Sequence, residues 1–427
     1  MNVLLIGSGG REHALAWGIC KSAKLDRLYI APGNPGTALL GTNVELDVTQ
    51  FSEVAGFVDK NKIDLTVIGP EQPLVDGITD FLTEKGHKVF GPSAAAAQLE
   101  GSKSFAKMMM QKYGIPTAKY KRFSFTEKSQ AEKHIEQSGS WPLVLKADGL
   151  AGGKGVFICE DQQDAVSRLG SMIDDPAMNA SGSLIIEEFM EGEEASVFAV
   201  TDGRQAKVLH AAQDHKRIGD GDIGLNTGGM GAYAPAPLMS QALLQEVENK
   251  VINRILDGMQ KEGMPYRGVL YIGLMITKEG PKVVEFNCRF GDPECQVLVP
   301  GLNSDLLELL LASVENRLGE TELILSDEYF CCVVMASKGY PEAYEKGKVI
   351  TGLDKLSDTA IVYHSGTKME GDNLLTAGGR VLSVTGSGRT LKKAIENVYS
   401  DVKKIHFENV YYRTDIGMKG LHKKNSV

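Results

Sequence analysis

No run of apolar residues in this 427-residue sequence approaches the roughly 20 that a membrane-spanning helix needs. The six cysteines contain no C-x-x-C pair, which disfavours structural zinc and a disulfide framework. Acidic residues outnumber lysine and arginine, and the net charge of -9 argues against a general nucleic-acid binder. The N-terminal apolar run is too short for a secretory signal and has no basic residue before it. We therefore expect a cytoplasmic protein with small-molecule partners and no membrane or nucleic-acid contacts.

The length exceeds the roughly 250–300 residues at which single domains stop growing, so two to four domains are expected. Residues 1–100 alternate strand-like and helix-like segments, which predicts a parallel sheet covered by helices on both faces. Ligands gather at the carboxyl ends of the strands in such sheets. Loops rich in glycine and proline follow three of these strands, at residues 7–10, 32–36 and 69–73.

The rest of the chain has mixed patterns typical of α+β units. A helix is expected at residues 103–113, because Gly114 and Pro116 beyond it form a typical stop. From about residue 326 a small final unit is expected, ending in an amphipathic helix. The expected strands lie at 143–146, 155–159, 184–188, 195–200, 269–276, 282–287, 330–336, 360–364 and 380–384, and the last helix at 391–405. The predicted fold class is α/β and α+β with several domains.

The first candidate site is G-S-G-G-R-E at residues 7–12, between a strand and a helix. Free backbone N–H groups and the helix dipole favour an anion at such a place. Glu12 stands where a dinucleotide fingerprint has its third glycine, and the second strand ends without an acidic residue, so a nicotinamide cofactor is disfavoured. A phosphate site and a tight packing turn both remain open.

A second candidate is K-A-D-G-L-A-G-G-K-G at residues 146–155. Its glycines would let backbone N–H groups close over a polyphosphate, and Lys146 would add a positive charge at the end of a strand. The spacing is not that of a P-loop, because Gly149 and Lys154 fall at the wrong interval and no Ser or Thr follows. A plain β-hairpin loop is the alternative, but ordering so many glycines is costly. We prefer phosphate binding.

The acidic segment E-E-F-M-E-G-E-E at residues 187–194 follows a strand. It could present backbone groups to a purine edge and a carboxylate to ribose hydroxyls. Taken alone, a solvated acidic turn is the better interpretation, because charge runs usually lie on the surface.

Glu285 and Asn287 lie two residues apart in the strand predicted at 282–287 and therefore share one face, with Val284, Phe286 and Cys288 on the other. Two hard oxygen donors on one face suit Mg²⁺, which also takes phosphate oxygens and water. A polar strand face is the alternative. The Arg, Asp and Glu residues at 289–294 are poor material for a core, so a functional site is favoured.

Residues 213–233 are rich in glycine and charge, and we predict a long loop there. Loops of this length are usually functional or disordered. His215 lies among cations and carboxylates, which favours a substrate loop over disorder.

Together these motifs resemble the phosphoribosylamine–glycine ligase family, also called glycinamide ribonucleotide synthetases, of the ATP-grasp superfamily. The resemblance extends from G-S-G-G-R-E-H at residues 7–13 to R-T-D-I-G at 413–417. Its most specific pieces are R-F-G-D-P-E at 289–294 and N-T-G-G-M-G-A-Y at 226–233, because neither is a generic nucleotide motif.

The resemblance implies an N-terminal Rossmann-like phosphoribosylamine-binding domain at residues 1–101 and an ATP-grasp domain at 102–325, with a mobile lid at about 121–191. It implies a small C-terminal α/β domain at 326–427. For ATP it implies phosphate contacts from Lys103, Lys146, Asp148, Gly149, Gly152, Gly153, Lys154 and Gly155, adenine contacts from Glu187, Glu188, Phe189 and Met190, and a ribose contact from Glu194.

The same resemblance implies that Glu285 and Asn287 hold Mg²⁺ or Mn²⁺. The sugar phosphate would lie against Gly9, Gly10, Asn34, Pro35, Gly36 and Glu71. Asp214, Lys216 and Arg289 would line the acceptor and acyl-phosphate region.

The implied reaction joins glycine to 5-phosphoribosylamine through glycyl phosphate, using ATP, in de novo purine biosynthesis, and we expect a monomer. Two rivals stay open. One is another ATP-grasp enzyme, such as a carboxylase that uses bicarbonate. The other is a nucleotide-sensing protein without catalysis, against which the set of Lys146, Glu285, Asn287 and Arg289 argues.

Overall fold

The first apolar runs of the chain form a five-stranded parallel sheet of order β3-β2-β1-β4-β5. In β1 (Asn2–Gly7), Val3 and Leu5 pack with α1 on one face, while Leu4 and Ile6 pack with α2, α3 and α4 on the other. Burial on both faces explains the continuous apolar run. The other elements are α1 (Gly10–Ile19), β2 (Arg27–Pro32), β3 (Thr42–Asn43), α2 (Phe51–Asn61), β4 (Leu65–Ile68), α3 (Glu71–Val75), α4 (Ile78–Glu84), β5 (Val89–Phe90) and α5 (Ala94–Gly101).

The computed structural model describes residues 1–150, 155–179 and 182–421. The predicted parallel sheet with helices on both faces is confirmed. The segment at 69–73, predicted to be a loop, is helical from Glu71 onward, where α3 begins. Within the described ranges no helix is long and apolar enough to cross a bilayer.

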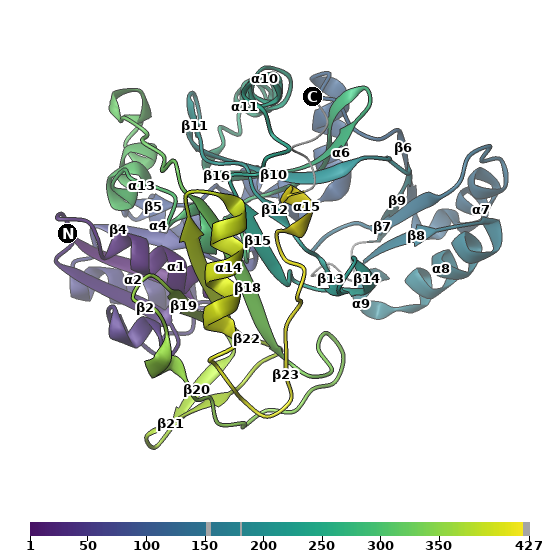
Figure 1. Ribbon diagram of the computed structural model, residues 1–427. Helices are drawn as coiled ribbons and strands as arrows, with labels where there is room; N and C mark the ends of the chain where they lie inside the picture. Colours follow the sequence, from purple (N-terminus) through teal and green to yellow (C-terminus); the bar gives the residue numbers. More distant parts are fainter. Residues whose placement is uncertain (151–154, 180–181, 422–427) are drawn as a thin grey trace.

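A central antiparallel sheet of order β11-β10-β16-β17 lies beside the first sheet. One face packs against α6 (Lys103–Lys112), α10 (Gln241–Val247) and α11 (Asn253–Lys261), and the other packs against α13 (Leu306–Val314) (Figure 1). Successive apolar residues of β10 pack alternately into these two cores from Val197 to Val200, as a strand buried on both faces requires. The strands are β10 (Glu193–Asp202), β11 (Ala206–Val208), β16 (Arg267–Thr277) and β17 (Gly280–Asn287), with the short α12 (Cys295–Leu298) after them.

Residues 120–188 form a smaller unit that projects from the central sheet on one side of the molecule (Figure 1). Its antiparallel sheet has the order β6-β9-β7-β8, and its own hydrophobic core lies between the sheet and two helices. The elements are β6 (Tyr120–Ser124), α7 (Lys128–Glu136), β7 (Leu143–Ala147), β8 (Val156–Cys159), α8 (Gln162–Asp174), α9 (Pro176–Asn179) and β9 (Ser183–Glu188).

The C-terminal sheet corrects one prediction. Residues 213–233 are not one long loop: β12 (Gln213–Asp214) and β15 (Gly231–Ala234) join the C-terminal sheet, and β13 (Arg217–Gly219) with β14 (Ile223–Asn226) forms a hairpin between them. The sheet order is β12-β15-β18-β22-β19, with β23 beside β18. The remaining elements are β18 (Tyr329–Ser337), β19 (Ile361–His364), β20 (Thr367–Glu370), β21 (Asn373–Thr376), β22 (Arg380–Gly388), α14 (Leu391–Val402), β23 (Val410–Tyr411) and α15 (Met418–Leu421).

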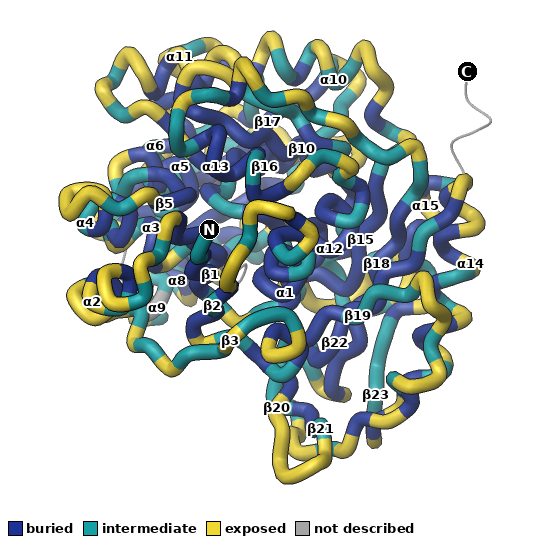
Figure 2. The backbone as a smooth tube through the Cα atoms, turned by 90° about the vertical axis from the view of Figure 1, so that its left-hand side faces the viewer, coloured by how far each residue is buried: buried dark blue, intermediate teal, exposed yellow. Residues whose placement is uncertain are grey.

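A buried histidine pair joins the first sheet's helix α1 to strand β19 of the C-terminal sheet. The backbone N–H of His364 donates to Nδ1 of His13 at 2.8 Å, and the amide of Asn34 donates to the His364 carbonyl at 2.9 Å. The tube view in Figure 2 shows β19 running beside α1. Because these bonds connect residues more than 300 positions apart, they fix the N- and C-terminal sheets relative to each other.

This histidine pair predicts that acid weakens the fold. Burial lowers the pKa of His13 to about 3 and that of His364 to about 4. In the unfolded chain both histidines have a pKa of about 6.5. Between this value and the lowered pKa values of the folded state, the unfolded state therefore binds more protons than the folded state. The free energy of unfolding therefore falls as pH drops below about 6.5, and we expect this loss to be smaller in His13→Asn.

Urea unfolding at pH 7 and pH 5 measures this difference. His406→Asn is the matched control, because the side chain of His406 is exposed. An acid-induced loss of the same size in both variants would contradict a role of His13 in the pH dependence.

Candidate active site

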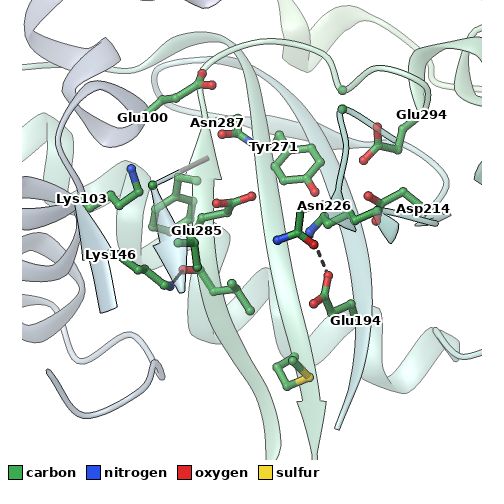
Figure 3. Close-up of a pocket in the computed structure, with 18 of the residues that line it drawn as sticks. Glu100, Lys103, Lys146, Glu194, Asp214, Asn226, Tyr271, Glu285, Asn287 and Glu294 are labelled. Atoms are coloured by element: carbon green, nitrogen blue, oxygen red, sulfur yellow. Dashed lines mark hydrogen bonds and ion pairs between the residues drawn. The ribbon is translucent and has the colours of Figure 1, made fainter. Parts of the chain in front are cut away.

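One cavity of about 1290 Å³ lies where the central sheet meets the 120–188 unit and the ends of the N- and C-terminal sheets. Figure 3 shows Lys103 and Lys146 on one side of Glu285, and Asp214 and Glu294 on the other. Most residues predicted from the sequence line this cavity: Glu71, Lys103, Lys146, Gly149, Gly155, Glu187, Phe189, Met190, Glu194, Asp214, Lys216, Glu285, Asn287 and Arg289.

Other predicted residues lie elsewhere. Gly9, Gly10, Asn34, Pro35, Gly36, Asp148 and Glu188 are not among the residues that line the cavity. Gly152, Gly153 and Lys154 lie outside the described residues. The predicted set therefore divides into residues that face a ligand space and residues that support it.

The cationic end of the cavity begins at the N-terminus of α6. Ser102 caps this helix by accepting a hydrogen bond from the Phe105 N–H at 3.1 Å, so Lys103 is the first helical residue. Its Nζ donates to the Gly149 carbonyl at 2.7 Å, and Gly149 has a φ of +86°, a conformation that favours glycine. The strand-end loop predicted to bind phosphate is thus attached to the helix that carries Lys103.

Asp148 supports this loop from behind. Its carboxylate accepts hydrogen bonds from the Ser104 N–H at 3.2 Å, the Gly149 N–H at 3.0 Å and the Ser183 hydroxyl at 3.1 Å. Although burial opposes it, this hydrogen bonding lowers the pKa of Asp148. The side chain holds the loop against α6 and does not face the ligand space.

Glu187 is buried between two lysines. Its carboxylate lies 3.1 Å from Lys107 Nζ and 2.9 Å from Lys146 Nζ, and all three side chains are less than 10% exposed. Burial lowers the pKa of Lys107 to about 8, and the charge of Glu187 opposes that shift. The Glu187 side chain therefore positions two cations at the cavity wall.

The segment between β9 and β10 gives the cavity an apolar part. Phe189 and Met190 line it together with Ala106, Met110 and Met275. Glu188 points to the outside, where its carboxylate accepts a hydrogen bond from the Lys119 N–H at 3.0 Å. Apolar side chains next to a cationic end suit a flat aromatic ring that is attached to a phosphate chain.

Glu285 and Asn287 both line the cavity from β17, opposite Gly273 and Tyr271 of β16. The expected position of Val284 is wrong. A β-bulge makes Val284 the extra residue between the pairs Gly273–Glu285 and Leu274–Val283, so Val284 also lines the cavity.

The Asn287 amide is oriented so that its nitrogen donates hydrogen bonds to the Phe286 carbonyl and to Glu100 Oε1, both at 3.1 Å. In that orientation its oxygen is left for a ligand, as is the carboxylate of Glu285. Among the described residues there is no cluster of three or more His, Cys, Asp or Glu side chains that could hold a metal. One carboxylate and one amide oxygen match a Mg²⁺ site that takes its other ligands from phosphate and water.

A mixed acidic and basic group occupies the opposite side of the cavity. Lys216 Nζ lies 2.8 Å from Glu194, which remains accessible within the cavity. Lys216 lowers the pKa of Glu194, and although burial opposes it, Asp214 and Glu194 raise the pKa of Lys216. Burial raises the pKa of Asp214 and raises that of Glu294 to about 7.

Arg289 does not lie free in the cavity. Its guanidinium donates to Glu71 at 3.2 Å and to Glu100 at 2.9 Å, and Arg11 lies 3.8 Å from the same Glu71 carboxylate. Although burial opposes it, the two carboxylates raise the pKa of Arg289, which stays charged. This network connects α1, α3 and α5 of the N-terminal sheet to the end of β17.

The predicted glycine-rich loops at 7–10 and 32–36 pack between sheets. A Cβ on Gly10 would meet Gln296 at 2.6 Å and the Ser365 hydroxyl at 2.8 Å, so the absence of a side chain lets the start of α1 approach the C-terminal sheet. The Asn34 amide donates to the Ser8 carbonyl at 2.8 Å and joins the two loops.

Sequence reasoning missed several cavity residues. Lys107 lies one helical turn after Lys103, and this spacing could have found it, because residues four apart share a helix face. Glu294 was part of a recognised motif without a role of its own. Glu100, Arg380 and Lys419 also line the cavity, and no local pattern identifies them, since they come from α5, β22 and α15.

Comparison with known proteins gives matches along most of the chain. The phosphoribosylglycinamide synthetase N domain matches residues 1–100, the ATP-grasp (A) domain matches 101–295 and the C domain matches 330–419. A phosphoribosylamine–glycine ligase of Mesorhizobium japonicum is 47% identical over 427 residues and covers 100% of both chains. One from Chlorobaculum tepidum is 48% identical, covering 99% of this chain and 100% of that protein.

Solved structures agree. The crystal structure of phosphoribosylamine–glycine ligase from Thermotoga maritima is 35% identical with a TM-score of 0.83, covering 97% of this chain and 100% of that chain. The biotin carboxylase domain of Hydrogenobacter thermophilus 2-oxoglutarate carboxylase has a TM-score of 0.73 at 14% identity, covering 96% and 91%, which shows a shared fold alone. The chain is a ligase of the phosphoribosylglycinamide synthetase family, built on the ATP-grasp fold.

Proposed function

We propose that this chain joins glycine to 5-phosphoribosylamine, giving glycinamide ribonucleotide, ADP and phosphate in de novo purine biosynthesis. The observation that carries the proposal is the convergence of three kinds of chemistry in one cavity. Lysines 103 and 146 form a cationic end, Glu285 and Asn287 present hard oxygen donors, and Asp214 lies with Glu294 on the far side. A nucleotide, a metal ion and small polar substrates each find a matching region.

For the nucleotide, we assign the apolar segment at Phe189 and Met190 to adenine and Glu194 to the ribose. Lys103, Lys146 and the loop from Gly149 to residue 155 would contact the phosphates. We infer supporting roles for two side chains: the Glu187 carboxylate positions Lys107 and Lys146, and Asp148 anchors the loop. Both act through the groups that would contact ATP.

For the metal, we assign Glu285 and Asn287 to Mg²⁺, with Mn²⁺ as a second ion of similar ligand preference. A divalent ion at this place would neutralise charge on the nucleotide phosphates and orient them. The side-chain oxygens of Glu285 and Asn287 fit that task because they lie on the cavity side of one strand and no other ligand cluster competes among the described residues.

For catalysis, glycine's carboxylate oxygen attacks the terminal phosphorus of ATP, releasing ADP and forming glycyl phosphate. The amine of phosphoribosylamine then attacks the carbonyl carbon, phosphate leaves, and the amine loses one proton. The protein positions these groups and offsets negative charge with Lys146, Lys216 and Arg289. Water must be kept out, because glycyl phosphate would hydrolyse.

On the sugar side, we retain Glu71, which lines the cavity beside Arg11. Gly9, Gly10, Asn34, Pro35 and Gly36 are assigned a supporting role, because they fix α1, and with it Arg11, against the C-terminal sheet. Lining residues from both sheets suit a substrate that is held between them.

We propose units at residues 1–101, 102–325 and 326–427, with a lid at about 121–191, since each has its own sheet, although β12 and β15 reach into the last one. We retain the expectation that the chain acts as a monomer. The six cysteines are free thiols, which supports a cytoplasmic location.

The test is ADP release by the purified chain with ATP and Mg²⁺, adding or omitting glycine and phosphoribosylamine made in situ from ribose 5-phosphate and ammonia. We expect ADP to form in amounts equal to the amide only when both substrates are present. ADP release stimulated by bicarbonate instead would support a carboxylase. ATP binding without turnover would support a nucleotide sensor.

A further inference from the structure

Glu100, near the C-terminal end of α5, is a buried carboxylate that no step of the proposed reaction uses. Its side chain is 7% exposed and lies next to Asn287 at the cavity (Figure 3). One of its oxygens accepts hydrogen bonds from the Arg289 guanidinium at 2.9 Å and from the Asn287 amide nitrogen at 3.1 Å. The other accepts from the Cys288 N–H at 2.7 Å and from the Cys288 thiol at 3.0 Å. A single carboxylate on α5 thus receives hydrogen bonds from three successive residues at the end of β17.

The number and kind of these contacts explain why a carboxylate stands at this position. An ionised carboxylate only accepts hydrogen bonds and has about four lone-pair sites, which match the four donors around Glu100. The positive charge of Arg289 compensates the buried negative charge. Because each Glu100 oxygen already accepts two hydrogen bonds, neither is left to bind a cation directly.

The contact with Glu100 decides which end of the Asn287 amide faces the cavity. An amide has a donor end and an acceptor end, and only its oxygen can bind a hard cation. Since Glu100 cannot donate a hydrogen bond, it holds the NH2 end, and the Phe286 carbonyl accepts from the same nitrogen at 3.1 Å. The Asn287 oxygen is therefore left for a ligand, on the strand face that also carries Glu285.

The position of Glu100 in the chain connects this orientation to the phosphate-binding end of the cavity. Glu100 lies three residues before Lys103, and Ser102 between them caps α6. Both Glu100 and Lys103 line the cavity. The turn from α5 to α6 thus holds the end of β17 and presents a cation from the same short segment.

We propose that Glu100 is a positioning residue of the metal site: it orients the Asn287 amide so that the amide oxygen binds Mg²⁺. The inference rests on the metal assignment of the proposed function and adds to it a residue that does not contact the ion. Partners that orient metal ligands typically contribute about 10–100-fold to metal affinity.

Isothermal titration calorimetry with a non-hydrolysable ATP analogue, in Mg²⁺ and in EDTA, measures metal binding without turnover. In Glu100→Gln, the glutamine oxygen can stay with the Cys288 N–H while its NH2 turns toward Asn287, whose amide then rotates and presents NH2 to the metal. We expect the Mg²⁺ concentration that half-saturates the gain in analogue affinity to rise by about 10–100-fold. The affinity in EDTA should stay unchanged, because Lys103 and Lys146 keep their places.

Glu71→Gln is the matched control. Glu71 is the other carboxylate that pairs with Arg289, at 3.2 Å, whereas the Asn287 nitrogen donates to Glu100 and Phe286. This variant should leave the half-saturating Mg²⁺ concentration unchanged. A rise as large as in Glu100→Gln would mean that the effect passes through Arg289, and it would overturn the proposal.

A substitution at Asn287 tests the contact itself and does not depend on how Glu100→Gln folds. Asn287→Asp places a second carboxylate against Glu100, and like charges in contact disfavour the folded state. We expect the urea midpoint of Asn287→Asp at pH 7 to lie below that of the unaltered chain. Adding Glu100→Gln should raise this midpoint again, because glutamine can donate to the new aspartate. A midpoint of Asn287→Asp equal to that of the unaltered chain would contradict the contact.

The outcomes separate this inference from the proposed function. If Mg²⁺ does not change the analogue affinity of the unaltered chain, the metal assignment of the proposed function has failed, and the inference with it. If the unaltered chain responds and Glu100→Gln is half-saturated at the same Mg²⁺ concentration, the positioning role is overturned while the metal assignment stands. Equal losses of affinity in Mg²⁺ and in EDTA would also overturn it, because they would show a general effect on the fold.

Discussion

Glu285→Gln should reduce kcat/KM by roughly a thousandfold while the protein stays folded. Glutamine keeps the length and shape of the side chain, so the packing of β17 is preserved. The substitution removes the only carboxylate of the two proposed metal donors, and a neutral amide is a weaker ligand for a hard divalent ion. The chain would bind the metal–nucleotide complex poorly and lose charge neutralisation at the transferred phosphoryl group.

ADP formation at increasing Mg²⁺ concentration measures this effect. Because the variant loses metal affinity, high Mg²⁺ should restore part of the activity. Glu279→Gln is the matched control, since Glu279 lies at the turn of the same hairpin, is 76% exposed and pairs with Lys282 on the surface. Near-normal activity of Glu285→Gln at low Mg²⁺ would show that the metal is held elsewhere.

The placement of Glu285 shows what local sequence patterns can predict. A period of two puts Glu285 and Asn287 on one strand face, and both line the cavity. The buried strands β1 and β4 could also be predicted from the sequence, because strands covered on both faces are continuous apolar runs. These features depend on neighbours within a few residues.

Features that depend on partners far away in the sequence could not be predicted from local patterns. The bulge at Val284 arises from pairing with β16, and nothing in the local sequence marks it. The region at 213–233 was predicted to be a loop because it is rich in glycine and charge, but its last strand, β15, pairs with β18, about a hundred residues later. Taken alone, the segment of Glu187 was interpreted as a solvated turn, but Lys107 and Lys146, from two other elements, enclose the Glu187 carboxylate.

Glu187→Gln should destabilise the chain by about 3–5 kcal/mol, the usual cost of removing one partner from a buried ion pair. Glu187 is 2% exposed and neutralises both Lys107 and Lys146, so the substitution leaves two buried cations facing each other. Lys107 already has a pKa lowered to about 8 by burial, and without Glu187 it should lose its proton more easily. We also expect the KM for ATP to rise, because Lys146 is no longer held at the cavity wall.

Urea unfolding with and without ATP measures both effects, and Lys107→Met tests their cause. If repulsion between uncompensated lysines is responsible, the double variant Glu187→Gln with Lys107→Met should recover a large part of the stability that Glu187→Gln loses, because methionine fills similar space without charge. Glu132→Gln is the matched control, since it breaks only a surface pair with Lys128, for which about 0–1 kcal/mol is expected. A loss in Glu187→Gln no larger than in this control would mean that the lysines find other partners. Activity lost without any change in stability would instead place the Glu187 carboxylate in direct contact with the nucleotide.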